Sequence, residues 1–483
     1  MDKKADLTRI EGERLSRFVL HSALLRLIDP VRGDPTRLLD ESPDGSFLNA
    51  SQLKQKFLDS FALISSTSRS GAKTATAVCL ETNQQTGNVL RVARNHGLCP
   101  KDLAGLEKVL QILQEVARKG TQLLITVMDL TDMMRHAEKL SMQAEPEILR
   151  LVVELDRGRI MFIAGQIEKK GIRQSLQSLQ SQRHNTGPSS KEFRCWLANH
   201  PFMTTLQNWG DATTTMLIEW AAQARWHHAE QLKSLLRDDN LQGKAWLGHL
   251  HKVARYYSAI KSMVKLAVRE PELFMRISIR DIEAPAQLLF KYPNDEAPIL
   301  AIVRRLMGKN ANLMMEQLER RLSTTKIEAR LRDACRLSMT LHAEMQLVVF
   351  YEGNPGLSPC MRFIGTSKKA CFLCDRYMRS HPLKLQASAC HQKIYPSWMP
   401  PPYYKIPGKP TGMVFMKLSQ EIEKLTEREL KTGLTALRRP WNHDSTAGPS
   451  LTLTATVPTE LRSLEAKQEN LIVLDGSLSD DSE

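Results

Sequence analysis

The sequence predicts an α/β fold that is divided by a long helical segment. Residues 50–95 combine one amphipathic helical pattern with two short β-prone runs. Residues from about 100 to 330 keep a helical apolar spacing, whereas residues 335–437 mix helical segments with a short strand. We derive the fold class from these strands at both ends of the chain and the helices between them.

The segment before the helical region carries clear local signals. Residues 1–49 are expected to form an N-terminal helical segment. Residues 50–64 carry apolar side chains at helical spacing and predict an amphipathic helix. Residues 74–81 and 89–93 are β-prone and are separated by a cluster of turn residues, so together they predict a β-hairpin.

The long middle segment contains apolar stripes of the kind that face a protein core. One stripe is formed by Leu106, Val109, Leu110, Leu113 and Val116. Such stripes nearly always pack inside a protein and carry no functional information. We therefore predict an all-helical region at 100–330 and expect the chemistry elsewhere in the chain.

The chain is basic, with 67 Lys and Arg residues against 53 Asp and Glu residues and a formal net charge of +14. This balance favours polyanionic partners such as nucleic acid. The alternative is a solvated basic surface without a partner, because no Arg-rich tract or RNA-binding signature concentrates the charge.

Cysteine usage and hydropathy predict an intracellular protein, either cytoplasmic or nuclear. Eight cysteines in 483 residues, most of them far apart, do not make a disulfide framework. Residues 1–17 lack the apolar core of a signal peptide. No apolar run approaches the length needed to span a bilayer, so we expect no membrane association.

Cys371 and Cys374 form the one closely spaced cysteine pair in the sequence. Residues 359–364 are a short apolar run of strand length, residues 365–369 turn the chain, and a helix is predicted to start near Cys371. With the spacing i, i+3 in a first helical turn, both sulfurs point the same way. The positive end of the helix favours thiolates, which zinc requires as ligands.

A histidine that could complete a metal site occurs in the sequence HAE at 342–344. HAE also occurs at 136–138 and 228–230, but those copies lie inside long helical stripes with no strand or cysteine pair after them. The copy at 342 is followed by a helical segment, a Gly/Pro turn, a short strand and the cysteine pair. Two helices that start at the same end of a sheet would bring His342 and both cysteines to one zinc ion.

Three protein ligands leave one tetrahedral position of a zinc ion open, and a water bound there becomes a nucleophile near neutral pH. Glu344 is the candidate for the proton shuttle to the leaving ammonia. Two alternatives remain. One is a redox cysteine pair, and the other is a closed zinc site whose fourth ligand comes from Cys360, His381, Cys390 or His391.

Three stretches, LHAEMQLVVFYE, SKKACFLCDRYM and CHQKIYPSW, resemble the OTT-type deaminase-like family, which is widespread in fungi and largely uncharacterised. That family is part of the zinc deaminase superfamily that includes cytidine deaminases and tRNA adenosine deaminases. The resemblance is strongest over 335–400 and implies zinc ligands at His342, Cys371 and Cys374 with a proton shuttle at Glu344. One departure is Ala370, because the general superfamily signature has proline before the first cysteine.

The resemblance also implies a cytidine deaminase-like α-β-α sandwich, which needs a helix and a hairpin before the histidine-bearing helix. The only such order lies at 50–95, so we predict that a large all-helical insertion splits the core. The domains expected are an N-terminal helical segment at 1–49, the first part of the core at 50–95, the insertion at 100–330, the zinc-binding part at 335–437 and a disordered, acidic-ended tail at 438–483.

Three further residues are candidates for holding the substrate. Asn95 follows the second strand of the hairpin, and deaminases that resemble this chain often use an asparagine there. The alternative is that Asn95 merely turns the chain. His391 and Tyr395 are candidates for lining the pocket by hydrogen bonding and base stacking, whereas simple packing against the core is the alternative for Tyr395 and for Trp398.

The function predicted is hydrolysis of the exocyclic amine of a nucleobase, nucleotide or nucleic acid. The alternatives are a catalytically inactive, zinc-stabilised scaffold and a nucleic-acid-binding protein. In the tail, Leu471, Ile472, Val473 and Leu474 followed by acidic residues resemble a SUMO-interaction motif. Such a run could add a strand to a partner's sheet, and an inert solubilising tail is the alternative.

Overall fold

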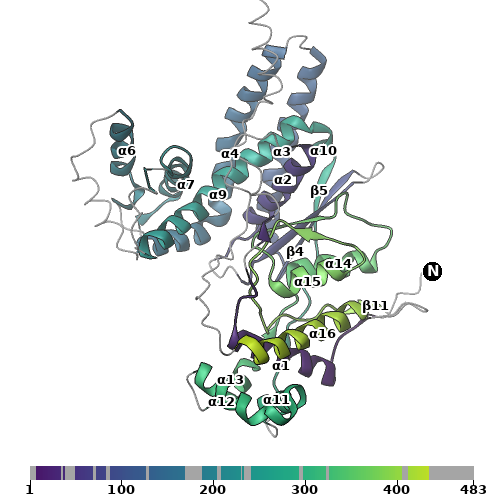
Figure 1. Cartoon of the computed structure of the whole chain (residues 1–483). Coiled ribbons are helices and arrows are strands. Elements are labelled where there is room, and N and C mark those ends of the chain that lie inside the picture. The colour runs from purple at the N-terminus through teal and green to yellow at the C-terminus, as the bar shows by residue number, and fades with distance from the viewer. Residues whose placement is uncertain are drawn as a thin grey trace, which may run out of the picture.

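Helices predominate in the computed structural model, which also contains a mixed β-sheet (Figure 1). The structure describes residues 7–33, 36–37, 49–68, 72–82, 87–126, 130–168, 188–203, 208–229, 231–232, 241–292, 297–322, 326–404 and 412–433. Within these ranges, no helix combines the length and the apolar character needed to cross a membrane. The predicted tail at 438–483, including the motif at 471–474, lies outside the described residues.

The centre of the fold is a five-stranded sheet with the order β5-β4-β3-β8-β9. Its strands are β3 (Thr76–Glu81), β4 (Asn88–Arg94), β5 (Ile277–Asp281), β8 (Phe363–Thr366) and β9 (Gln386–Ala387). The antiparallel pair β3 and β4 is the hairpin expected from the sequence. Antiparallel pairing of β3 with β8 places Val78 opposite Gly365 and so joins two distant parts of the chain in one sheet.

One face of the sheet presents its larger apolar side chains to a core that we call the helical core. Val78, Leu80, Leu90, Val92 and Phe363 belong to it. The described helices with bounded ranges that contribute to this core are α2 (Ala50–Ile64), α3 (Pro100–Thr126), α4 (Leu130–Glu168), α6 (Pro188–Ala198), α7 (Asp211–Trp226), α9 (Leu241–Arg269) and α10 (Pro271–Met275). A short 3₁₀ turn, η1 (Pro201–Met203), adds Phe202.

The other face of the sheet packs against a second core, which we call the site core. It includes Ala77, Cys79, Ala93 and Ile364, which alternate along the strands with residues of the helical core, as the period of two requires. Its helices are α1 (Gly12–Ile28), α11 (Pro298–Met307), α12 (Ala311–Leu322), α13 (Ile327–Ala334), α14 (Ala343–Gly353), α15 (Phe372–Ser380), α16 (Met413–Arg428) and the π-helical η4 (Glu429–Gly433). In Figure 1, α14 and α15 lie on the other side of the sheet from α2 and α3.

Short strand pairs and one 3₁₀ turn complete the described elements. β1 (Leu7–Thr8) pairs with β11 (Tyr403–Tyr404), β2 (Thr36–Arg37) with β10 (Ala389–Cys390), and β6 (Leu288–Phe290) with β7 (Leu337–Met339), all antiparallel. The turn η3 (Gly308–Asn310) connects α11 with α12. In the N-terminal segment predicted to be helical, the structure thus has one helix, α1, with the short strands β1 before it and β2 after it.

The helix predicted at 50–64 is observed as α2 with the same bounds. It begins with a capping box, in which Asn49 Oδ1 accepts a hydrogen bond from Gln52 N at 2.8 Å and Gln52 Oε1 accepts one from Asn49 N at 3.0 Å. This reciprocal pair satisfies two amide groups that a helix start leaves without intrahelical partners.

The prediction of an all-helical insertion at 100–330 is wrong near its end. β5 and β6 lie within this range, and β5 pairs in parallel with β4, so that it extends the central sheet. Ile277 and Ile279 alternate with Ser278 and Arg280, but this alternation is too short to predict a strand by itself, and pairing with β4 completes it. The helices between β4 and β5 therefore end with α10.

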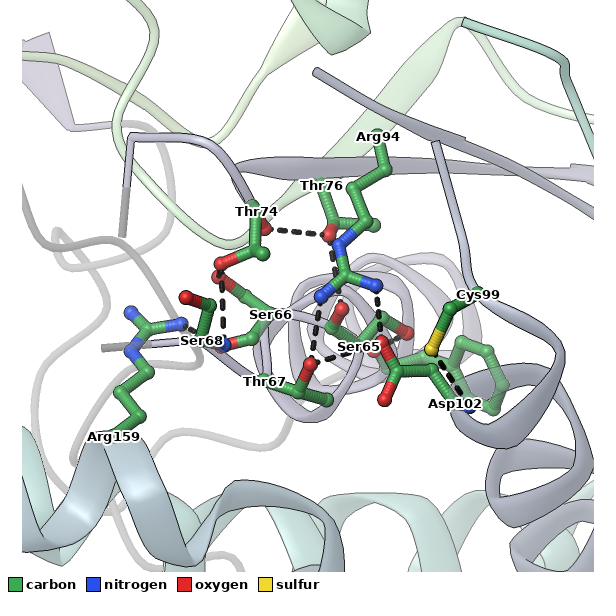
Figure 2. A network of polar contacts seen from close by, with 11 residues as sticks. Ser65, Ser66, Thr67, Ser68, Thr74, Thr76, Arg94, Cys99, Asp102 and Arg159 are labelled. Carbon is green, nitrogen blue, oxygen red and sulfur yellow. Dashed lines mark hydrogen bonds and ion pairs between the residues drawn. The ribbon is translucent and has the colours of Figure 1, made fainter. Parts of the chain in front are cut away.

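A network of polar contacts connects the sheet with the helices of this middle segment (Figure 2). Arg94, the last residue of β4, forms an ion pair with Asp102 in the first turn of α3 and donates to Thr67 Oγ1 at 2.6 Å. On α4, Arg159 donates to the carbonyl oxygen of Ser66 at 2.7 Å. The end of β4 is thus fixed from the side of the helical core.

Candidate metal centre and its pocket

His342 occupies the N-cap position of α14, where the backbone is still extended (φ −63°, ψ 150°). The strand-like segment before it is fixed by two backbone hydrogen bonds, from Thr340 N to Ser397 O at 2.9 Å and from Met399 N to Thr340 O at 3.0 Å. The segment that leads to His342 thus consists of α13 and the strand β7, and α14 follows it.

Cys371 is the N-cap of α15, and its Sγ accepts a hydrogen bond from Cys374 N at 3.4 Å. Cys374 lies in the first turn of the same helix, so both sulfurs are at the helix start, as the spacing predicts. Both cysteines are buried. Trp398 is fully buried and donates its Nε1–H to Cys374 Sγ at 3.3 Å.

The three residues bring their donor atoms to one point. His342 Nδ1 lies 3.7 Å from Cys371 Sγ and 3.4 Å from Cys374 Sγ. All three donor atoms lie within 4.8 Å of one another, which makes them a group that could hold a metal ion. Two thiolates and one imidazole are a donor set that suits zinc. The residues present therefore fit this metal.

No fourth protein ligand is found among the described residues. Cys360, His381, Cys390 and His391 are all described, and none of them belongs to the metal-binding group. The same holds for the histidines of the other two HAE copies, His136 and His228. The geometry thus favours three protein ligands over the closed site that the sequence left open.

Burial and mutual contacts set the ionisation of the metal-free site. Burial opposes ionisation of the Cys371 thiol, but the hydrogen bond from Cys374 and the nearby His342 outweigh it and hold the pKa of Cys371 well below its usual range. Burial and the neighbouring Cys371 sulfur raise the pKa of Cys374. Burial also raises the pKa of the Glu344 carboxyl. Of the two cysteines, Cys371 is therefore the one whose surroundings favour the thiolate.

A cavity of about 430 Å³ lies against this centre. His342, Glu344 and Cys371 line it, and so do all three residues proposed as substrate contacts, which are Asn95, His391 and Tyr395. Its volume lies in the range that small-molecule sites occupy. The structure thus brings the predicted site residues together, with Cys374 buried behind the cavity wall.

Asn95 makes two protein contacts at the cavity. Its Oδ1 accepts a hydrogen bond from Ala343 N at 2.8 Å, and its Nδ2 donates to Ala72 O at 2.9 Å. The first contact satisfies an amide group at the start of α14, next to His342. The neighbouring Arg94 carbonyl accepts from Gln346 Nε2 at 3.1 Å, which adds a second contact between the end of β4 and α14. Asn95 therefore positions the helix that carries His342 and Glu344.

His391 and Tyr395 present rings to the cavity. His391 Nδ1 accepts a hydrogen bond from Lys393 N at 3.0 Å, and burial lowers the pKa of His391 to about 4. A neutral imidazole that accepts at Nδ1 carries its proton on Nε2 and is a donor there. The Tyr395 ring lies edge-on to His391 at 5.7 Å and to His342 at 6.2 Å between ring centroids.

Sequence reasoning missed several cavity residues. Gln287 donates from Nε2 to Thr340 Oγ1 at 2.7 Å and also contacts His96 Nε2 at 3.4 Å. Gln287 lies in the range predicted to be helical, and no local pattern marks it. The cavity is also lined by Lys73 and by Lys368 and Lys369, the two lysines in the loop before Cys371. Only this last pair lies beside a recognised motif.

Residues 341–402 match the family model described as "OTT_1508_deam:-like deaminase". The match confirms the resemblance to the OTT-type deaminase-like family, and its range includes His342, Glu344, both cysteines and Trp398. Comparisons with curated proteins and with solved structures gave no match. The family match and the His/Cys/Cys group together suggest a deaminase.

Proposed function

We propose that this chain is a zinc-dependent deaminase that hydrolyses the exocyclic amine of a nucleobase, free or as part of a nucleotide or nucleic acid. The observation that carries the proposal is the convergence of His342, Cys371 and Cys374 beside a cavity that Glu344 also lines. A purely structural zinc site needs neither an open ligand position nor a cavity with a carboxylate in its wall.

Each residue has a distinct task in this proposal. His342, Cys371 and Cys374 would hold the metal. Zinc bound by three protein groups supplies a water of lowered pKa as the nucleophile. Glu344 follows the His342 N-cap by two residues and is buried, with 9% of its surface exposed. It would accept a proton from the water and deliver it to the leaving amine.

The base would lie against the rings of His391 and Tyr395. His391 Nε2–H would donate to a carbonyl oxygen or ring nitrogen, and Tyr395 would contact the face or edge of the base. Asn95 would act mainly by fixing the first turn of α14, since both ends of its amide already contact the protein.

We also propose that the sheet with α2, α14 and α15 corresponds to a cytidine deaminase-like core. The sheet has helices on both faces, and strands from 50–95 and from 335–437 are neighbours in it. In this proposal the helices between β4 and β5 are the inserted part. Such an insertion adds little loop-closure entropy if the inserted helices pack well.

Zinc analysis and an ammonia-release screen test the function together. Purified protein should contain about one zinc ion per chain. It should release ammonia from at least one member of a panel of nucleosides, nucleotides and RNA. Glu344→Gln should keep the zinc and lose about 10²-fold or more in rate, because it removes the proton shuttle and no ligand.

Glu352→Gln is the matched control, because Glu352 lies on the same helix α14 but does not line the cavity. Its rate should stay close to that of the unmodified protein. Wild-type turnover by Glu344→Gln would remove the catalytic role of Glu344. Stoichiometric zinc without ammonia release from any substrate of the panel would favour the inactive scaffold.

A further inference from the structure

The walls of the cavity carry unequal charge. Three lysines, Lys73, Lys368 and Lys369, line it, whereas Glu344 is the one carboxylate among its lining residues. A bound zinc ion would not change this excess, because its two positive charges are offset by the thiolates of Cys371 and Cys374. Ammonium groups around a small cavity raise the local concentration of anions.

The lysines come from two loops that are fixed to each other. Lys73 precedes β3, and Lys368 and Lys369 lie between β8 and α15. Thr76 N donates to Ser367 Oγ at 2.9 Å, and Ser367 N donates to Thr76 O at 3.0 Å. These reciprocal bonds keep the two loops side by side at the cavity.

Asn95 also anchors the first of these loops. Its contact with the carbonyl of Ala72 holds the residue next to Lys73 against the start of α14. From Lys73 through Lys368 to Lys369, the lysines change from exposed to half-buried to buried. The three lysines therefore differ in depth, and they lie on loops whose backbones are fixed to each other and to the start of α14.

A free nucleoside brings no anion to these lysines. Its base and sugar are neutral, so they offer the ammonium groups hydrogen-bond acceptors but no opposite charge. A 5′-phosphate or a backbone phosphodiester supplies an anion, and lysine binds phosphate as a compact point charge. The basic chain as a whole, with a net charge of +14, favours the same ligands.

We propose that the cavity selects a phosphate-bearing substrate over the free nucleoside, with Lys73 and Lys368 as the residues that determine this specificity. The inference rests on the proposed function for the identity of the base-binding end. The proposal that the other end of the cavity binds phosphate rests on the lysines alone, and a binding measurement can test it.

The test compares each of the four ribonucleosides with its 5′-monophosphate, and with a short single-stranded RNA, by calorimetry on the zinc-loaded protein. For at least one base, the phosphate-bearing form should bind about 10-fold or more tightly than the nucleoside, as one charge-assisted contact provides. A preference for the monophosphate identifies a free nucleotide, and a preference for RNA alone identifies the phosphodiester backbone.

The double variant Lys73→Gln/Lys368→Gln should lose this preference, whereas Lys73→Arg/Lys368→Arg should keep most of it. Lys417→Gln, an exposed lysine on α16 that does not line the cavity, is the matched control and should bind like the unmodified protein. Circular dichroism checks that the double variant is folded, and the charge-retaining pair provides a second check.

The inference and the proposed function can fail separately. Equal binding of nucleoside and phosphate forms for every base, or an unchanged preference in the glutamine variant, overturns the inference and leaves deamination possible. A lysine-dependent preference without ammonia release supports the inference and contradicts the proposed function. If neither nucleosides, nucleotides nor RNA bind, the inference is wrong.

Discussion

The two faces of the central sheet differ in the size of the apolar side chains that they present. Strand β3 gives Val78 and Leu80 to the helical core but Ala77 and Cys79 to the site core. The larger side chains fill the space beneath α2, and the smaller ones allow α14 to pack close to the sheet. Because α14 begins with His342, close packing on this face helps to place the metal ligand.

The two cores also differ in what else they bury. The helical core contains Trp196 and Trp220, whose rings stack at 4.5 Å and whose Nε1–H groups each donate to the other residue's carbonyl oxygen at 3.1 and 2.9 Å. Beside the site core, burial lowers the pKa values of His21, His381 and His391 to about 4. Both sides are thus stabilised by apolar burial, and in our proposal the site core also depends on metal.

The largest expected effect comes from removing the proposed metal ligands. Cys371→Ser combined with Cys374→Ser should reduce zinc from about one ion per chain to almost none, because serine is a poor zinc ligand at neutral pH. Hydrogen exchange should rise in α14 and α15 and change little in α4 and α9, since the metal would connect only elements of the site core. Elemental analysis and mass spectrometry measure the two effects.

Cys360→Ser is the control for these cysteine variants, because Cys360 is exposed and outside the metal-binding group. It should leave both zinc content and exchange unchanged. Full zinc occupancy in the double variant would show that the metal binds elsewhere. An equal increase of hydrogen exchange in α9 would show that loss of the metal ligands affects both cores.

The second prediction compares neighbouring residues on opposite faces of β3. Leu80→Ala should cost about 2–5 kcal/mol of unfolding free energy, because it leaves a cavity in the helical core. Cys79→Ala, on the other face, removes one sulfur atom and should cost less than about 1.5 kcal/mol. Urea denaturation measures both, and a larger loss for Cys79→Ala would reverse the assignment of the two faces.

The third prediction concerns the close approach of β8 to α2. A Cβ at Gly365 would lie 2.2 Å from the backbone carbon of Leu58, so the helix and strand must move apart to accept a side chain. We expect Gly365→Ala to lower the unfolding free energy by about 1–3 kcal/mol. Gly356→Ala is the control, because a Cβ at Gly356 would meet no other atom within 4 Å, and the stability of this variant should be nearly unchanged.

The candidate metal-binding residues could be predicted from the sequence, because few residue types bind zinc and two of these residues are close together in the chain. Cys371 and Cys374 lie in one helical turn, and few residue types other than His provide a third ligand for zinc. The helix α2 and the β3–β4 hairpin were predictable for a similar reason, since their periodicity is contained within a few neighbouring residues.

The missed elements depend on distant partners. β5 was assigned to a helical region because its five residues become a strand only through pairing with β4. Gln287 and Lys73 reach the cavity only after the sheet has brought their loops together. Strand pairing of this kind leaves no mark in the local sequence, so single-sequence reasoning cannot place such residues.

The smallest effect expected is a pH dependence that involves His21 in α1. His21 Nε2 accepts a hydrogen bond from Arg305 on α11 at 2.6 Å, and Arg17 and Glu423 are the other charged groups that act on it. Burial and Arg305 lower the pKa of His21 from 6.5 to about 4. Between these values the unfolded chain binds more protons than the folded one, so stability falls as the pH falls.

His21→Gln should therefore reduce the acid sensitivity of the protein, because glutamine can accept from Arg305 and does not titrate. Between pH 7 and pH 5, the unmodified protein should lose roughly 1–2 kcal/mol more unfolding free energy than the variant. Urea denaturation at the two pH values gives the difference. The remaining loss in the variant includes His381 and His391, which also lie beside the site core with lowered pKa values. Identical pH dependence of both proteins would mean that the pKa of His21 is the same in the folded and unfolded states, and the lowering of this pKa by burial and Arg305 would be wrong.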